Sequence, residues 1–339
     1  MKNFLALIAL ALVSMAAVAV ACEKCRVGTI EPLQTYFGIN ADPMGELRYT
    51  ETRRLFSVLH ESGAGSVRMP LRWNQLEPKS GQWVFARADA AINQLPNDIE
   101  VIVTLTGVPD WAKSTDATSP YPFQNIGDWG NFVDIVVKRY KNRVRHWEIW
   151  DAPNTDSFGP NPTAKAYFDV LKSSYEGIKA IDPKCLVLLG GLDSNGVTVG
   201  PTSKAKVENF LVDLYEAGGA GYFDACNIHP YVQLLDGAPR VLELAQETMR
   251  VMGKYGDADK PLYLTEVGVA AEGDDALAAQ AQILADTFKV VKNQKQICHV
   301  MWSSLRDHGQ GSMGIIDKSW HKKPAFDAFK KAAEEKVIK

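Results

Sequence analysis

The sequence is poor in the patterns that bind metals, nucleic acids or dinucleotides. Its 339 residues include five cysteines and six histidines, with a single CxxC spacing and no His-x-His pair, so we expect neither a zinc site nor a metal-dependent barrel hydrolase. Lys+Arg 37 nearly balance Asp+Glu 40, and no basic block interrupts the chain. This balance argues against a nucleic-acid partner. We expect no metal and no cofactor.

The amino terminus has the order of a secretory signal. Lys2 precedes an apolar run over residues 4–20, and small residues stand at Ala19 and Ala21. We expect a signal peptide over residues 1–21, an N-terminal extension over 22–35 and a folded domain over 36–339. The same residues also fit a bacterial lipoprotein box with a lipid anchor at Cys22. The expected location is therefore periplasmic or extracellular, or the outer membrane as a lipoprotein, with no later transmembrane segment.

Three cysteines lie inside or directly before expected strands, where a small apolar side chain packs well. We interpret Cys185, Cys226 and Cys298 as buried free thiols. Export also permits disulfides, and Cys22 with Cys25 or Cys185 with Cys226 are the alternative pairs.

Strand-like and helix-like runs alternate along the whole chain. The expected strands cover residues 36–40, 66–72, 100–106, 146–150, 185–190, 225–229, 262–266 and 299–303. The expected helices cover 50–61, 86–95, 128–140, 163–181, 203–217, 239–255, 274–292 and 323–336. Continuous apolar runs such as 186–189 are typical of a sheet buried on both faces. Eight such units predict the α/β class and a single (β/α)8 TIM barrel. An open doubly wound sheet would want a glycine-rich turn after the first strand, and 37–42 supply none.

Polar and aromatic residues gather where the expected strands end. A barrel brings these ends together on one face. Sugars present an apolar face that packs on indole or phenol rings and hydroxyls that pair with polar side chains. The predicted substrate-binding residues are Arg68, Trp73, Trp111, Trp150, Asn154, His229, Tyr231, Trp302 and Asp307. The alternative is that several of these aromatic side chains only cap the barrel.

Several motifs in this order resemble one group of enzymes. Residues 147–154 read WEIWDAPN and resemble the Trp-Asn-Glu-Pro-Asn segment of clan A retaining glycoside hydrolases. The closest resemblance is to family 39 and its exopolysaccharide-degrading relatives. Further matching segments are 66–68 (SVR), 73–78 (WNQLEP), 188–192 (LLGGL), 222–224 (YFD), 229–231 (HPY), 265–268 (TEVG) and 323–326 (KPAF).

The resemblance implies a site with one of its two carboxylates missing. Glu266 matches the nucleophile of the family, whereas Ala152 occupies the position of the general acid/base Glu. Asp151 replaces the Asn that holds the sugar 2-hydroxyl. His229 and Tyr231 match residues that hold the nucleophile.

Retaining hydrolysis uses two carboxyl groups about 5–5.5 Å apart, and alanine supplies none. Side-chain alternation predicts that Glu148 and Trp150 share the facing of Ala152, with Glu148 about 13 Å deeper. We therefore expect Glu148 to be a core carboxylate bonded to Arg68. Asp151, expected on the opposite face, is an awkward substitute acid.

Two functions remain open at this point. The first is an exported glycosidase acting on the O-glycosidic bonds of a poly- or oligosaccharide, with Glu266 as nucleophile and an impaired proton donor. The second is an inactive carbohydrate-binding pseudoenzyme. A third explanation of Ala152 is a deliberate substitution in an ordinary hydrolase.

Overall fold

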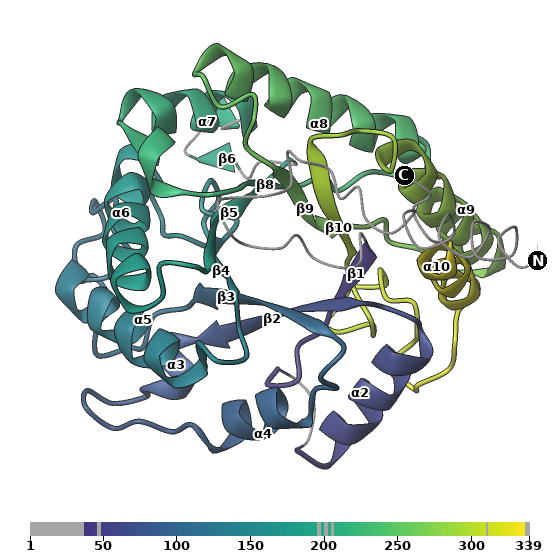
Figure 1. The fold of residues 1–339 in the computed structure, drawn as a ribbon, viewed down its shortest axis with the longest axis horizontal. Helices are drawn as coiled ribbons and strands as arrows, with labels where there is room; N and C mark the ends of the chain where they lie inside the picture. The colour runs from purple at the N-terminus through teal and green to yellow at the C-terminus, as the bar shows by residue number, and fades with distance from the viewer. Residues whose placement is uncertain are drawn as a thin grey trace, which may run out of the picture.

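The chain folds as a closed barrel of parallel strands. A computed structural model describes residues 37–45, 49–194, 198–199, 203–204, 207–309 and 311–335. Eight strands form the barrel in the order β1-β10-β9-β8-β5-β4-β3-β2, and the helices surround it (Figure 1). The strands are β1 Phe37–Asn40, β2 Ser66–Arg72, β3 Glu100–Thr106, β4 His146–Asp151, β5 Leu186–Asp193, β8 Cys226–His229, β9 Leu262–Val267 and β10 Ile297–Trp302. The predicted (β/α)8 TIM barrel is confirmed.

The expected helices are present, with one late start. The α-helices are α2 Thr52–Glu61, α3 Trp73–Leu76, α4 Ala86–Gln94, α5 Ile126–Tyr140, α6 Ala164–Ile181, α7 Val207–Glu216, α8 Gly237–Lys254, α9 Asp274–Val291 and α10 Pro324–Glu334. Two 3-10 turns lie at Tyr49–Glu51 and Gly219–Tyr222. The helix predicted from residue 203 begins at 207, because 203–204 (β7) pair antiparallel with 198–199 (β6). The predicted signal peptide and N-terminal extension lie outside the described residues.

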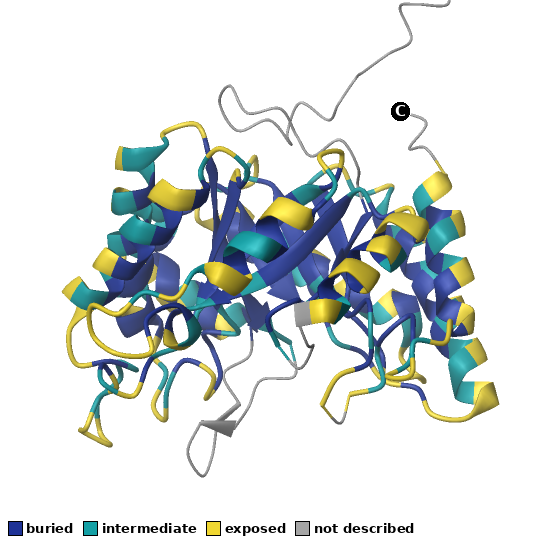
Figure 2. Ribbon diagram, turned by 90° about the horizontal axis from the view of Figure 1, so that it is seen from below, coloured by how far each residue is buried: buried dark blue, intermediate teal, exposed yellow. Residues whose placement is uncertain are grey.

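Two apolar layers hold the barrel together. The larger one packs the outward faces of the strands against the helices, and Figure 2 shows the strands as the buried centre of the molecule. A smaller cluster fills the inside of the barrel and contains Ile102, Leu186, Leu188, Ala225, Tyr263, Cys298 and Met301. The barrel is therefore packed rather than open, as is usual for this fold. Within the described residues, every helix is too short or too polar to cross a bilayer.

A tyrosine on α6 fixes the backbones of two central strands. Thr163 caps α6 by accepting from the amide of Ala166 at 3.2 Å. From this helix, the buried Tyr167 hydroxyl donates to the carbonyl of Ile149 at 2.8 Å and accepts from the amide of Gly190 at 2.7 Å. These bonds lie beside the carboxyl ends of β4 and β5. They hold the part of the barrel from which the candidate site is built.

The cysteines follow the prediction in part. Cys185 and Cys226 are buried and free, and burial raises the pKa of each thiol to about 12. Cys298 is disulfide-bonded, which corrects its interpretation as a free thiol. Cys298 is 9% exposed, whereas Cys185 and Cys226 are fully buried.

Candidate active site

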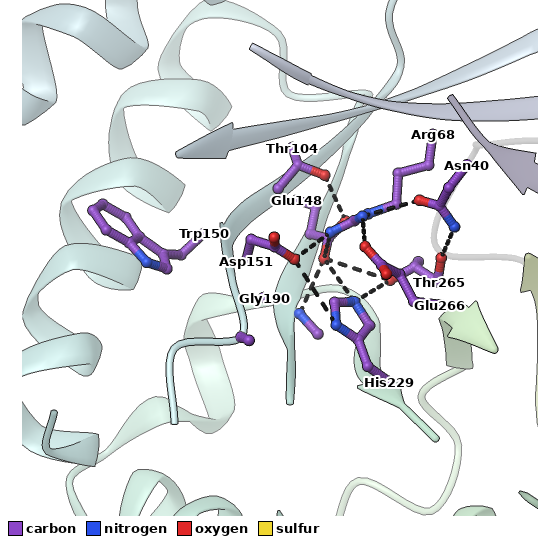
Figure 3. Close-up of polar contacts among 12 residues, drawn as sticks. Asn40, Arg68, Thr104, Glu148, Trp150, Asp151, Gly190, His229, Thr265 and Glu266 are labelled. Carbon is purple, nitrogen blue, oxygen red and sulfur yellow. Dashed lines mark hydrogen bonds and ion pairs between the residues drawn. The ribbon is translucent and has the colours of Figure 1, made fainter. Parts of the chain in front are cut away.

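One arginine gathers the charged groups at the carboxyl ends of the strands (Figure 3). Arg68 on β2 is 4% exposed and bonds Glu148 through Nε at 2.5 Å and Nη2 at 3.0 Å. Its Nη2 also donates to Asp151 Oδ1 at 2.8 Å. Its Nη1 donates to Glu266 Oε1 and to Asn40 Oδ1, the latter at 3.0 Å. Three carboxylates from two strands, β4 and β9, therefore share one guanidinium.

Glu148 is the structural partner of this arginine. It is fully buried and accepts further bonds from Thr104 Oγ1 at 2.9 Å, the Gly191 amide at 3.0 Å and Asn227 Nδ2 at 3.0 Å. Burial alone raises the pKa of a carboxyl group, but the Arg68 charge outweighs it and lowers the pKa of Glu148 to about 2. The predicted pairing of Glu148 with Arg68 is confirmed, and its saturated oxygens leave it no free position for a ligand.

Glu266 is held differently, with part of its carboxylate open to solvent. Its side chain is 14% exposed at the end of β9. Besides Arg68, the hydroxyls of Tyr231 and Ser303 donate to Oε2, the second at 3.0 Å. Burial alone would raise the pKa of Glu266, but the charges of Arg68 and His229 and the Tyr231 hydroxyl lower it below its ordinary value. The group is therefore an ionised carboxylate at neutral pH.

A bulge in β9 presents two neighbouring residues to the same space. Between Leu264 and Val267, β9 carries one residue more than the facing stretch of β10. Such an extra residue re-aims side chains near sites. Thr265 consequently contacts Asn227 Nδ2 at 2.8 Å inside the barrel, while Glu266 still reaches Arg68.

The end of β4 also departs from regular alternation, which corrects the predicted facing of Asp151. Trp150 has φ 72° and Ala152 has φ 48°, both in the left-handed region that L-residues rarely occupy. The turn at Trp150 places Asp151 on the same side as Glu148, where both carboxylates meet Arg68. Asp151 therefore faces the site, contrary to the expectation from alternation.

The same turn removes Trp150 from the site. Its side chain points away from the charged cluster (Figure 3), is 1% exposed and packs on Trp129 and Phe158 with ring centroids 5.1 Å away in each case. Its Nε1 donates to the carbonyl of Ser157 at 3.2 Å. Trp150 was predicted to bind substrate, and its burial contradicts that prediction.

Asp151 and Ala152 form the open edge of the site. Both residues are half-buried, and the Asp151 side chain is 45% exposed. Because Asp151 and Glu266 each lie one hydrogen bond of about 3 Å from the same guanidinium, their bonded oxygens are within about 8 Å of each other. Ala152 contributes only a methyl group next to this gap.

His229 lies beneath the carboxylates. It is 1% exposed, and its Nε2 lies 3.0 Å from Thr265 Oγ1 and 3.6 Å from Glu148 Oε1. Gly191 makes room for the ring, since a Cβ there would stand 1.9 Å from His229 Nε2. Burial alone would lower the pKa of His229, but the nearby carboxylates, Glu266 foremost, raise it.

One group of potential metal ligands occurs among the described residues. Atoms of Glu148, Asp151 and His229 lie within 4.8 Å of one another. The Arg68 guanidinium already donates to both carboxylates. Arg68 thus already offsets part of the negative charge of this cluster.

Two more predicted sugar-binding tryptophans are part of the packing. Trp73 and Trp302 are fully buried. The Trp73 indole donates to Glu77 Oε2 at 2.8 Å, and that of Trp302 donates to the Met313 carbonyl at 2.9 Å. Both rings cap the barrel wall, so their predicted contact with substrate is contradicted.

Two predicted polar contacts are also used within the protein. Asn154 is fully buried and exchanges two 2.9 Å bonds with the backbone of Asp193. Asp307 is 8% exposed and pairs with Lys323 at 3.1 Å.

Trp111 differs from the other predicted tryptophans because it is only half-buried. Its indole donates to the Glu77 carbonyl at 2.9 Å, and it keeps an accessible face.

Sequence reasoning missed the polar side chains that support the carboxylates. Asn40 at the end of β1 and Ser303 just after β10 contact Arg68 and Glu266 respectively. Their positions at strand ends were available as a signal. Asn227 and Thr265 lie within strands that read as buried and apolar, so only the three-dimensional arrangement reveals them.

The fold has clear relatives among solved structures, although no protein-family model matches the sequence. A family 39 glycoside hydrolase from Bacteroides cellulosilyticus WH2 superposes with TM-score 0.68 and 21% identity, covering 90% of this chain and 64% of that one. A monomeric β-xylosidase from Caulobacter crescentus CB15 gives TM-score 0.68 and 19% identity, covering 89% and 68%. Xylanase 10B from Thermotoga petrophila RKU-1, solved with xylobiose, superposes with TM-score 0.64 and 16% identity, covering 92% of this chain and 99% of that one.

These comparisons establish the architecture. The structural neighbours are glycoside hydrolases of more than one family with the same parallel barrel. The chain spans slightly less than two thirds of the length of the Bacteroides protein.

Proposed function

We propose that this chain is an exported glycoside hydrolase-like protein that acts on O-glycosidic bonds of a poly- or oligosaccharide. Glu266 attacks the anomeric carbon in a retaining mechanism. The observation that carries the proposal is the Glu266 carboxylate, which is partly exposed at the carboxyl end of β9 and kept ionised by Arg68 and Tyr231. In this fold, active residues lie at that end of the strands.

The proton donor is the weak part of this machinery. Ala152 stands where the resemblance to family 39 expects the acid. Glu148 is buried and fully bonded, and the Asp151 carboxylate is engaged by Arg68. Losing a positioned acid typically removes about 10²–10⁴-fold in rate, or roughly 3–5 kcal/mol. We expect cleavage of sugar leaving groups to be slow.

The absence of a carboxyl group at position 152 supports a second candidate function. With a methyl group at Ala152, the protein can retain oligosaccharide binding while hydrolysing nothing, as a carbohydrate-binding pseudoenzyme. The two functions differ in whether Glu266 ever forms a bond to the sugar.

A panel of 2,4-dinitrophenyl glycosides separates them, because this leaving group departs with little protonation. The panel begins with the xyloside, since one neighbour is described as a β-xylosidase, and continues with glucoside and mannoside. Under the hydrolase proposal the chain releases dinitrophenol and Glu266→Gln does not. Turnover by Glu266→Gln rejects the nucleophile assignment, and binding of oligosaccharides without turnover of any glycoside supports the pseudoenzyme.

The variant Ala152→Glu tests the position of the missing acid. We expect it to accelerate hydrolysis of an oligosaccharide by at least about 10²-fold and to change dinitrophenyl glycoside turnover far less. An equal effect on both substrates, or none, contradicts the placement at residue 152.

We further propose that the chain is exported with cleavage before Cys22. Intact mass of the protein purified from its host distinguishes a plain mature terminus from a lipid-modified Cys22, and retention of residues 1–21 rejects both.

A further inference from the structure

The site carries more negative charge than it neutralises. Glu148, Asp151 and Glu266 contribute three carboxylates around Arg68. His229 is the second basic group that contacts them. Even with His229 protonated, three negative charges face two positive ones, so a cationic ligand group is favoured here.

Asp151 is the carboxylate that a ligand can reach. Its side chain is 45% exposed, against 0% for Glu148 and 14% for Glu266. Only Oδ1 is bonded, to Arg68 at 2.8 Å. Within the part of the chain that the structure describes, Oδ2 has no hydrogen-bond partner. The next residue, Ala152, offers nothing polar that would compete for a ligand.

The shared guanidinium keeps Asp151 within reach of a sugar bound at Glu266. Asp151 and Glu266 bond adjacent nitrogens of one guanidinium. If the anomeric carbon meets Glu266, as proposed above, a substituent on the neighbouring ring carbon lies within reach of Asp151. An ionised carboxylate only accepts hydrogen bonds, and an ammonium donor adds a Coulomb attraction to it that a neutral hydroxyl or amide donor lacks.

Resting on the proposed function, we infer that the site takes saccharides with a free amino group next to the anomeric carbon, with Asp151 as the specificity-determining residue. The substrate class is thus a de-N-acetylated hexosamine glycan. Its ammonium group donates to Asp151 Oδ2 and offsets the excess negative charge.

Three tetrasaccharides test this inference because they share a β-1,4-linked backbone and differ only at C2. They are the glucosamine tetramer with an amine, the N-acetylglucosamine tetramer with an acetamide, and cellotetraose with a hydroxyl. Affinities are measured by isothermal titration calorimetry at about 0.15 M salt, where long-range charge effects are screened, and in the presence of a chelator.

We expect the amine to bind at least about tenfold more tightly than the hydroxyl and the acetamide in the wild-type protein. Asp151→Asn keeps the shape of the side chain and should remove this preference. Asp156→Asn, at an exposed position on the loop beyond β4, is the matched control and should keep it. Melting curves of both variants verify that they fold.

Equal affinity for all three tetramers in the wild-type protein overturns the inference, as does a preference that survives in Asp151→Asn or disappears in Asp156→Asn. Binding of none of them also overturns it. The proposed function has its own test, the turnover of dinitrophenyl glycosides. It can therefore stand when the amine preference fails.

Discussion

Removing the positive charge of Arg68 should destabilise the barrel strongly. In Arg68→Met the carboxylate of Glu148, which is fully buried, loses both of its bonds to the guanidinium. Leaving one partner of a buried ion pair uncompensated costs about 3–5 kcal/mol. For a chain of this size, each kcal/mol lowers the unfolding midpoint by about 2 °C. We therefore expect a decrease of roughly 6–10 °C at neutral pH.

Arg139→Met is the matched control for this substitution. Arg139 pairs with Asp89 at 2.5 Å, but the two side chains are 43% and 31% exposed, and exposed pairs contribute only about 0–1 kcal/mol. Its midpoint should fall by no more than about 2 °C. The double variant Arg68→Met/Glu148→Gln should recover part of the loss, because the uncompensated charge is removed.

Thermal unfolding followed by circular dichroism measures all four proteins. The reasoning is refuted if Arg68→Met and Arg139→Met lower the midpoint equally, or if adding Glu148→Gln makes the Arg68→Met protein still less stable. Either result would mean that the buried cluster is not held together by its charge.

Three further outcomes follow from the site. Because the lowered pKa of Glu266 depends in part on the Tyr231 hydroxyl, Tyr231→Phe should move the acidic limb of the pH–kcat/KM profile upward; an unchanged limb argues against that bond. The pKa of Glu148 lies below its ordinary value of 4.5, at about 2, so its stabilisation is present above pH 4.5 and lost as pH falls to 2. This loss is on the order of 3 kcal/mol, and Glu148→Gln should flatten the midpoint-versus-pH curve over that window. Ala152→Gly should stabilise the protein by up to about 1 kcal/mol and so raise the unfolding midpoint, because φ 48° suits glycine. A lower midpoint contradicts this.

The barrel could be predicted because its strands are buried on both faces. Runs such as residues 101–103 and 186–189 are continuously apolar, and the strands that contain them are buried almost throughout. Turn and cap residues between these runs predicted the ends of most helices to within a few residues. Such local signals determine where elements lie, and the closed parallel topology follows from their regular alternation.

The facing of side chains at the strand ends could not be predicted in the same way. Alternation assumes extended backbone, and the positive φ of Trp150 breaks it one residue before Asp151. The bulge in β9 does the same before Glu266. Contacts with distant segments accompany both departures, since Trp150 packs on Trp129 and Glu266 bonds Arg68. The local sequence alone therefore does not predict them.

Aromatic residues at strand ends posed a related problem. Trp73 and Trp302 have the residue type and the strand-end position of sugar-binding platforms. Both are nevertheless fully buried, with their indole N–H groups bonded to the protein. A Trp that packs under a loop and a Trp that faces a cleft look the same in sequence. What separates them is the tertiary packing around the ring, such as that of Phe132 on Trp73.

The most direct test of the account is to look for a covalent sugar on Glu266. In a retaining mechanism the acid/base residue also activates the water that releases the sugar. With Ala152 at that position, release should be slow, so the glycosyl-enzyme should accumulate from a dinitrophenyl glycoside and give a burst of dinitrophenol. After an acid quench, intact mass spectrometry should show one added glycosyl group, and peptide mapping should place it on Glu266. An unmodified chain despite turnover, or a label on any other residue, would contradict the account.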